Sequence, residues 1–233
     1  MRIVYDGFKK GISIFWDDSI LLILFNFVCF LSLLPALLFY SVTQSDPSVL
    51  ASVVNTWLVL PFAFFIFALY HVLFDCRQDI VISIKSFLGY IRSTWKSALI
   101  FGVINIMVAL LVGWNLRFYA QFDEAWAGIV QWVFLSISLV WAILQIIMLP
   151  MYPRLEEPSF KLALKNSTAI FARYLIPVLT LVVWTVLFVV LTVMFQALGM
   201  LFSFVFIAAL GEGIIGEVVI VEQNAYPRSD PPE

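Results

Sequence analysis

The stretch WAGIVQWVFLSISLVWAILQIIML occupies residues 126–149 and contains no charged residue. A helix needs about 20 mostly apolar residues to cross a bilayer, so this stretch is long enough to span a membrane. Strands of β-barrel membrane proteins instead alternate apolar and polar residues over short segments. Residues 126–149 show no such alternation, and the stretch therefore predicts a transmembrane α-helix.

Five further stretches have the same character, and they are Ile20–Ser41, Leu50–Phe74, Ser97–Leu116, Tyr174–Phe195 and Leu198–Val221. The composition agrees, because 63% of the residues are hydrophobic and only 12% are charged, against about 45–50% and about 25% in soluble domains. We expect an all-α, polytopic membrane helical bundle of six transmembrane helices, forming one domain over residues 1–222. Residues 223–233 are polar and proline-rich, which predicts a disordered cytoplasmic tail.

Several function classes lack support in this sequence. The net charge is −2 and no basic cluster is present, so we expect no nucleic-acid partner. The chain has no P-loop, no His-Glu-x-x-His motif and no paired intramembrane aspartates, so we expect no catalysis, no cofactor and no metal. The glycines of residues 211–216 fit the dinucleotide fingerprint by spacing alone. They lie in an apolar stretch, where they favour close packing of helices.

The basic residues are distributed unevenly about the six predicted spans. Arg117 is the only one of the 13 Lys and Arg residues on its side of the membrane. Cytoplasmic connections carry the excess of Lys and Arg in membrane proteins. We therefore expect a multi-pass protein of the inner (cell) membrane with both termini in the cytoplasm.

The segments that precede the first, third and fifth spans are amphipathic. The aromatic residues on their apolar faces include Trp16, Phe87, Trp95, Phe160 and Phe171. This pattern predicts helices that lie in the membrane interface. The five aromatic side chains are candidate interfacial or partner contacts.

Two of these segments suggest an internal repeat. The pattern Phe-x3-Ile-x3-Trp-x9-Asn starts at Phe8 and again at Phe87, an offset of 79 residues. One interpretation is three parallel helical-hairpin repeats, each preceded by an interfacial helix. The other is that cytoplasmic linkers before spans are generally basic and amphipathic.

A few polar residues fall inside the apolar stretches. Glu212 and Glu217 are the only charged residues within the predicted spans, and such residues are often functional. One hypothesis is a polar cavity open to the cytoplasm, lined by Glu212, His71, Asn26, Gln145 and Asn105. The alternative is that each residue forms a separate hydrogen bond between helices. His71 and Asp75 are spaced as a helical pair, for which we expect a hydrogen bond rather than a metal site.

The chain resembles the YesL-like (DUF624) family of bacterial integral membrane proteins. The likeness lies in Asn26 with Pro35-Ala36, in the segment from Phe87 to Leu99, in Leu149-Pro150, and in Leu162-Ala-Leu-Lys-Asn-Ser. The sequence departs from the family pattern at Glu212. The resemblance implies no catalytic residues and an association with carbohydrate-uptake systems.

These observations lead to three functional hypotheses. The first is a non-catalytic accessory or scaffold subunit of a membrane complex linked to solute (carbohydrate) uptake. The second is a small carrier or channel with a pathway around Glu212. The third, an intramembrane enzyme, has the least support because paired catalytic groups are missing. The expected partners are the lipid bilayer and either a membrane transport complex or further copies of the chain.

Overall fold

The computed structural model describes residues 2–43 and 48–225, and these residues form helices and connections without a strand. The helices are α1 (Arg2–Asp17), α2 (Ser19–Thr43), α3 (Val49–Trp57), α4 (Leu60–Arg77), α5 (Ile84–Tyr119), α6 (Ala125–Met151), α7 (Phe160–Arg173), α8 (Leu175–Met194) and α9 (Gln196–Ala225), with a short 3₁₀ helix at Tyr152–Arg154.

Six segments of the described chain are long and apolar enough to cross a membrane, with α3 and α4 together forming one of them. This confirms the all-α class with six candidate spans, and the chain is an integral membrane protein. Residues 223–225 of the predicted tail continue α9, and the remainder of that tail lies outside the described residues.

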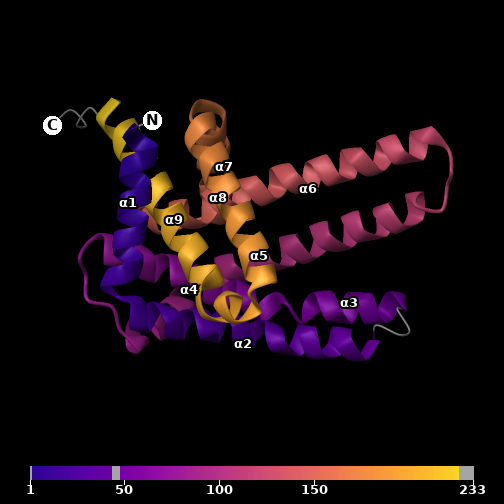
Figure 1. Cartoon of the computed structure of the whole chain (residues 1–233), viewed down its shortest axis with the longest axis horizontal. Helices are drawn as coiled ribbons and strands as arrows, with labels where there is room; N and C mark the ends of the chain where they lie inside the picture. The colour runs from indigo at the N-terminus through magenta and orange to yellow at the C-terminus, as the bar shows by residue number, and fades with distance from the viewer. Residues whose placement is uncertain (1, 44–47, 226–233) are drawn as a thin grey trace.

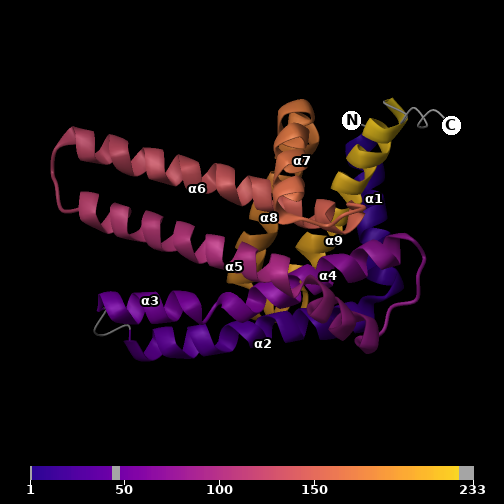
Figure 2. The ribbon, with the colours of Figure 1, turned by 180° about the vertical axis from the view of Figure 1, so that it is seen from behind.

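The helices form successive antiparallel pairs. Figure 1 shows α5 and α6 as a long pair whose far ends extend beyond the rest of the chain, with α2 and α3 running in the same general direction. The α8–α9 pair crosses the α5–α6 pair and the α2–α3 pair at a steep angle. Figure 2 shows the same arrangement from behind.

The three amphipathic segments are all helical. The segment before the third span is continuous with it in α5, which begins at a capping box formed by Ser83 and Ser86. The segment before the fifth span is α7, which begins where the Ser159 hydroxyl accepts a hydrogen bond from the Leu162 N–H. Side chains of this type satisfy the free N–H groups of a first helical turn.

The first amphipathic helix, α1, packs along α9, and the start of α1 lies beside the end of α9 in Figure 1. Glycines make this approach possible. A Cβ on Gly7 would lie 2.7 Å from the Cα of Ile214, and a Cβ on Gly11 would lie 2.8 Å from the Ala209 carbonyl oxygen. A Cβ on Gly213 would collide with both glycines of α1. This confirms the packing role expected for that glycine, and α1 is a packed helix as well as an amphipathic one.

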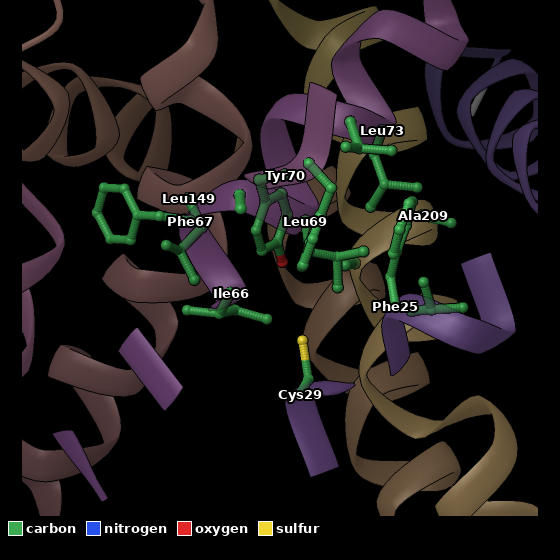
Figure 3. Packing of buried hydrophobic residues seen from close by; sticks show 14 of the residues in the cluster. Phe25, Cys29, Ile66, Phe67, Leu69, Tyr70, Leu73, Leu149 and Ala209 are labelled. Atoms are coloured by element: carbon green, nitrogen blue, oxygen red, sulfur yellow. The ribbon is translucent and has the colours of Figure 1, made fainter. Parts of the chain in front are cut away.

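The core surrounds α4, which contacts α2, α5, α6 and α9. Figure 3 shows the packing of Phe67, Leu69 and Leu73 of α4 with Phe25 of α2 and Ala209 of α9. Helices that are apolar on all sides, as α4 is, belong in such a centre.

Candidate functional site

Three glutamates spaced five residues apart on α9 each bind an arginine from a different segment. Glu212 pairs with Arg154 after α6, Glu217 with Arg77 at the end of α4, and Glu222 with Arg173 at the end of α7. Five residues correspond to a rotation of about 140° around a helix, so the three carboxylates point in different directions. In this way α9 is tied to three other segments of the chain.

Glu212 is the most deeply placed of the three. Its side chain is fully buried, and that of Arg154 is only 10% exposed. Arg154 Nη1 donates to Glu212 Oε2 at 2.9 Å and its Nη2 donates to Oε1, so the pair is bidentate. The guanidinium also donates to the Pro150 carbonyl and lies 5.1 Å from the ring centre of Phe74. The carboxylate charge is thus balanced by a partner with matching geometry.

Arg77 binds α9 through both its side chain and its backbone. Its Nη2 donates to Glu217 Oε1 at 2.6 Å, while its Nη1 donates to the carbonyls of Glu212 and Gly213 at 3.2 and 3.3 Å. Its side chain is 7% exposed. We refer to Arg77, Arg154, Glu212 and Glu217 as the Arg–Glu cluster.

Gly216 leaves the space that the Arg–Glu cluster occupies. A Cβ at this position would lie 2.5 Å from Arg77 Cζ and 2.6 Å from Arg154 Nη2. Both guanidinium groups therefore lie directly against the backbone of α9. Two positive and two negative charges balance within the cluster, and the described residues contain no group of three potential metal ligands. The arrangement is suited to joining helices inside an apolar layer.

The predicted cavity residues have different surroundings. Asn26 is buried against α9, where its Nδ2 donates to the Met200 carbonyl at 2.7 Å and its Oδ1 accepts from the N–H groups of Phe204 and Val205 at 2.8 and 3.1 Å. For Asn26 the alternative interpretation, a hydrogen bond between helices, describes the contacts. Glu212 is likewise bound to Arg154 instead of facing a cavity.

Two of the predicted cavity residues do lie together. Asn105 and Gln145 line a cavity of about 360 Å³ between α4, α5 and α6. Within it, Asn105 Oδ1 accepts a hydrogen bond from Trp141 Nε1 at 3.1 Å.

His71 lies apart from that cavity. Its ring stacks on Tyr90 at 4.9 Å, and its Nε2 has no hydrogen-bond partner among the described residues. Asp75 accepts a hydrogen bond from the Tyr90 hydroxyl at 2.5 Å. Tyr90 therefore contacts both members of the predicted helical pair.

The candidate aromatic contacts differ in exposure. Trp16 is 68% exposed and Trp95 is 46% exposed, so both can meet lipid or a partner. Phe87 is only 2% exposed and stacks on Phe25 with ring centres 4.3 Å apart, which removes it from the possible partner surface. Phe160 and Phe171 are partly buried against the core.

Arg77 and Arg154 are not among the site residues predicted from the sequence, where they count only as basic residues that determine orientation. A usable signal was present, because both follow the ends of predicted spans on the same side of the membrane as Glu212 and Glu217.

Comparison with known proteins adds no relative. No family model, curated protein or solved structure matches this chain. The fold and the Arg–Glu cluster define the class of protein, which is an integral membrane protein with six candidate spans and charged pairs inside its helical assembly. The resemblance to the YesL-like family stays a prediction.

Proposed function

We propose that this protein is a non-catalytic accessory or scaffold subunit of a membrane complex that takes up a solute. The resemblance to the YesL-like family favours a carbohydrate as that solute and the inner membrane as the location. The positive-inside rule favours cytoplasmic termini.

One observation supports a scaffold above the other hypotheses. The buried charges of the Arg–Glu cluster form ion pairs within the chain, while the α5–α6 pair projects from the other helices. Glu212 is 0% exposed and bidentate with Arg154. A carrier pathway through Glu212 would first have to break this pair, and a buried charge left without its partner is costly. The cluster therefore supports a structural role for Glu212.

The helical pair α5–α6 offers the surface for a partner. Only 17% of the apolar window of α6 is buried within the chain, the same share as for α8, against 61% for α9. Ile129, Trp132 and Val133 lie on the exposed part of α6, with Trp132 72% exposed. In a bilayer this face meets either lipid or a neighbouring helix.

Quantitative mass spectrometry after co-purification in mild detergent tests the proposal. We expect the tagged full chain to enrich a membrane transport protein over an unrelated six-span protein. The double variant Ile129→Ala/Trp132→Ala on α6 should lose that enrichment. The matched control Val193→Ala/Met194→Ala changes equally exposed residues of α8 and should keep it. Absence of any enriched partner, together with unchanged solute uptake after deletion of the gene, would disprove the proposal.

A further inference from the structure

Two adjoining cavities lie between α3–α4 and α5. The first has a volume of about 450 Å³ and lies between α3 and the C-terminal part of α5, with the end of α2 beside it. The second is the cavity of about 360 Å³ that contains Asn105 and Gln145. Thr56 and Ala109 line both, so the two spaces meet at these residues. Together they follow α5 from Arg117 to Phe101.

The first cavity has a mixed polar and apolar lining that includes a cation. Arg117 lies there, with Nη1 3.4 Å from the Ser52 hydroxyl oxygen. No carboxylate in residues 2–43 and 48–225 forms an ion pair with it. The Asn55 Oδ1 in the same wall is enclosed and accepts no hydrogen bond from the described residues. Buried acceptors are almost always hydrogen-bonded, so we expect a ligand in this cavity to donate a hydrogen bond to Asn55 Oδ1.

The second cavity is mainly apolar. Its walls include Phe62, Ile66, Phe101, Ile106 and Leu149. A ligand that filled both cavities would have a charged, hydroxyl-bearing end beside Arg117 and a hydrocarbon part beside these side chains. Apolar walls with a few placed polar groups are typical of ligand sites.

The first cavity lies near the ends of the spans, at the level where lipid headgroups are expected. Tyr40 and Trp114 line it near the ends of α2 and α5, and they are 54% and 46% exposed. Tyrosine and tryptophan side chains are enriched where the lipid headgroups lie. Arg117 supplies a cation at that level, and an arginine side chain can form charge-assisted hydrogen bonds with a phosphate.

We propose that the two adjoining cavities between α3–α4 and α5 bind one anionic phospholipid. Its phosphate lies beside Arg117, a hydroxyl of its headgroup faces Asn55, and one acyl chain enters the cavity lined by Phe62 and Phe101. This site is independent of the scaffold role, because its lining includes none of the α6 residues proposed to contact a partner.

Native mass spectrometry of the delipidated full chain tests the site. The probes are phosphatidylglycerol and phosphatidylcholine with identical acyl chains, and inorganic phosphate serves as competitor. We expect phosphatidylglycerol to bind about tenfold more tightly than phosphatidylcholine, as a charge-assisted contact implies. Inorganic phosphate should not displace it. Equal affinity for the two lipids, or complete displacement by phosphate, would overturn the proposal of an anionic lipid.

Two variants locate the site on the molecule. Arg117→Gln removes the cation, while Gly113→Leu fills the first cavity from a position where a Cβ meets nothing within 4 Å. Each should weaken phosphatidylglycerol binding about tenfold. Their matched controls are Arg92→Gln on the same helix and Gly128→Leu, where a Cβ also meets open space. Wild-type affinity in both test variants, or an equal loss in the controls, would contradict this location.

Discussion

At Gly216 the absence of a side chain determines the chemistry around it. Both guanidinium groups of the Arg–Glu cluster occupy the volume that a methyl group would need. Their donors can therefore reach the backbone carbonyls and carboxylates of α9 at the same time. Gly216 leaves room for the arginines of two ion pairs, whereas Gly7 and Gly213 allow the backbones of α1 and α9 to approach closely.

Substitution of Gly216 by alanine tests this function of the glycine. The added methyl group should displace both arginines and lower the free energy of unfolding by about 1–3 kcal/mol, the usual cost of overpacking. The control Gly89→Ala places a methyl group in open space on α5 and should raise that free energy by about 0.5–1 kcal/mol through helix propensity. Unfolding by sodium dodecyl sulfate in mixed micelles measures both. Equal effects of the two substitutions would contradict the interpretation.

The Arg154–Glu212 pair gives a second residue-level prediction. Arg154→Met leaves the fully buried Glu212 without its partner and should lower the free energy of unfolding by about 3–5 kcal/mol. Adding Glu212→Gln removes the orphaned charge, so the double variant should regain much of that stability. The same unfolding experiment measures both variants, and Asp6→Asn in the exposed Arg2–Asp6 pair is the control. Failure of the second substitution to recover stability would show that the pair is not coupled.

At the scale of the helices, the sequence predicts which segments are helical and which of their faces are apolar. It does not predict which other helix packs on each face. Residues 126–149 were predicted as a span and lie within α6. Phe87 was predicted on an apolar face, which is correct, yet Phe25 covers that face. Periodicity identifies an apolar side of a helix, but the partner is chosen by packing of residues distant in the chain. For the same reason the Arg154–Glu212 pair, 58 residues apart, is not encoded in any local pattern.

The contact of α2 with α9 gives a prediction at this scale. Asn26→Leu removes three hydrogen bonds to the backbone of α9 and should increase hydrogen exchange in residues 200–205, with a loss of about 1–3 kcal/mol. Asn115→Leu is the matched control, since among the described residues Asn115 donates to the Leu111 carbonyl of its own helix and to no other helix. Faster exchange spread evenly over all helices would argue against a local contact.

At the scale of the whole molecule, α9 is the helix that holds the other segments together. It packs with α1 and α8 along its length, binds Asn26 of α2, and carries the carboxylates that hold the ends of α4, α6 and α7. The α5–α6 pair, by contrast, projects from this assembly in Figures 1 and 2. One part of the protein is therefore held together by ion pairs and hydrogen bonds to α9, while the α5–α6 pair exposes most of its apolar surface.

The orientation of the whole molecule can be measured by cysteine labelling. The distribution of Lys and Arg predicts that the connection between α5 and α6 lies outside the cytoplasm. A membrane-impermeant thiol reagent should label Asp123→Cys in intact cells, and should label Lys9→Cys only after permeabilisation. The native Cys29 and Cys76 are buried, so the wild type provides the background signal. The reverse labelling pattern would place the termini outside.

The order of the Arg–Glu partners along the chain has a consequence for biosynthesis. Arg77 and Arg154 precede α9, so both leave the ribosome before Glu212 and Glu217 have been translated. Until α9 is inserted, the nascent protein carries two arginines at the ends of its spans without their carboxylates. Insertion of α9 supplies both carboxylates, so the last helix of the described chain neutralises the two arginines together.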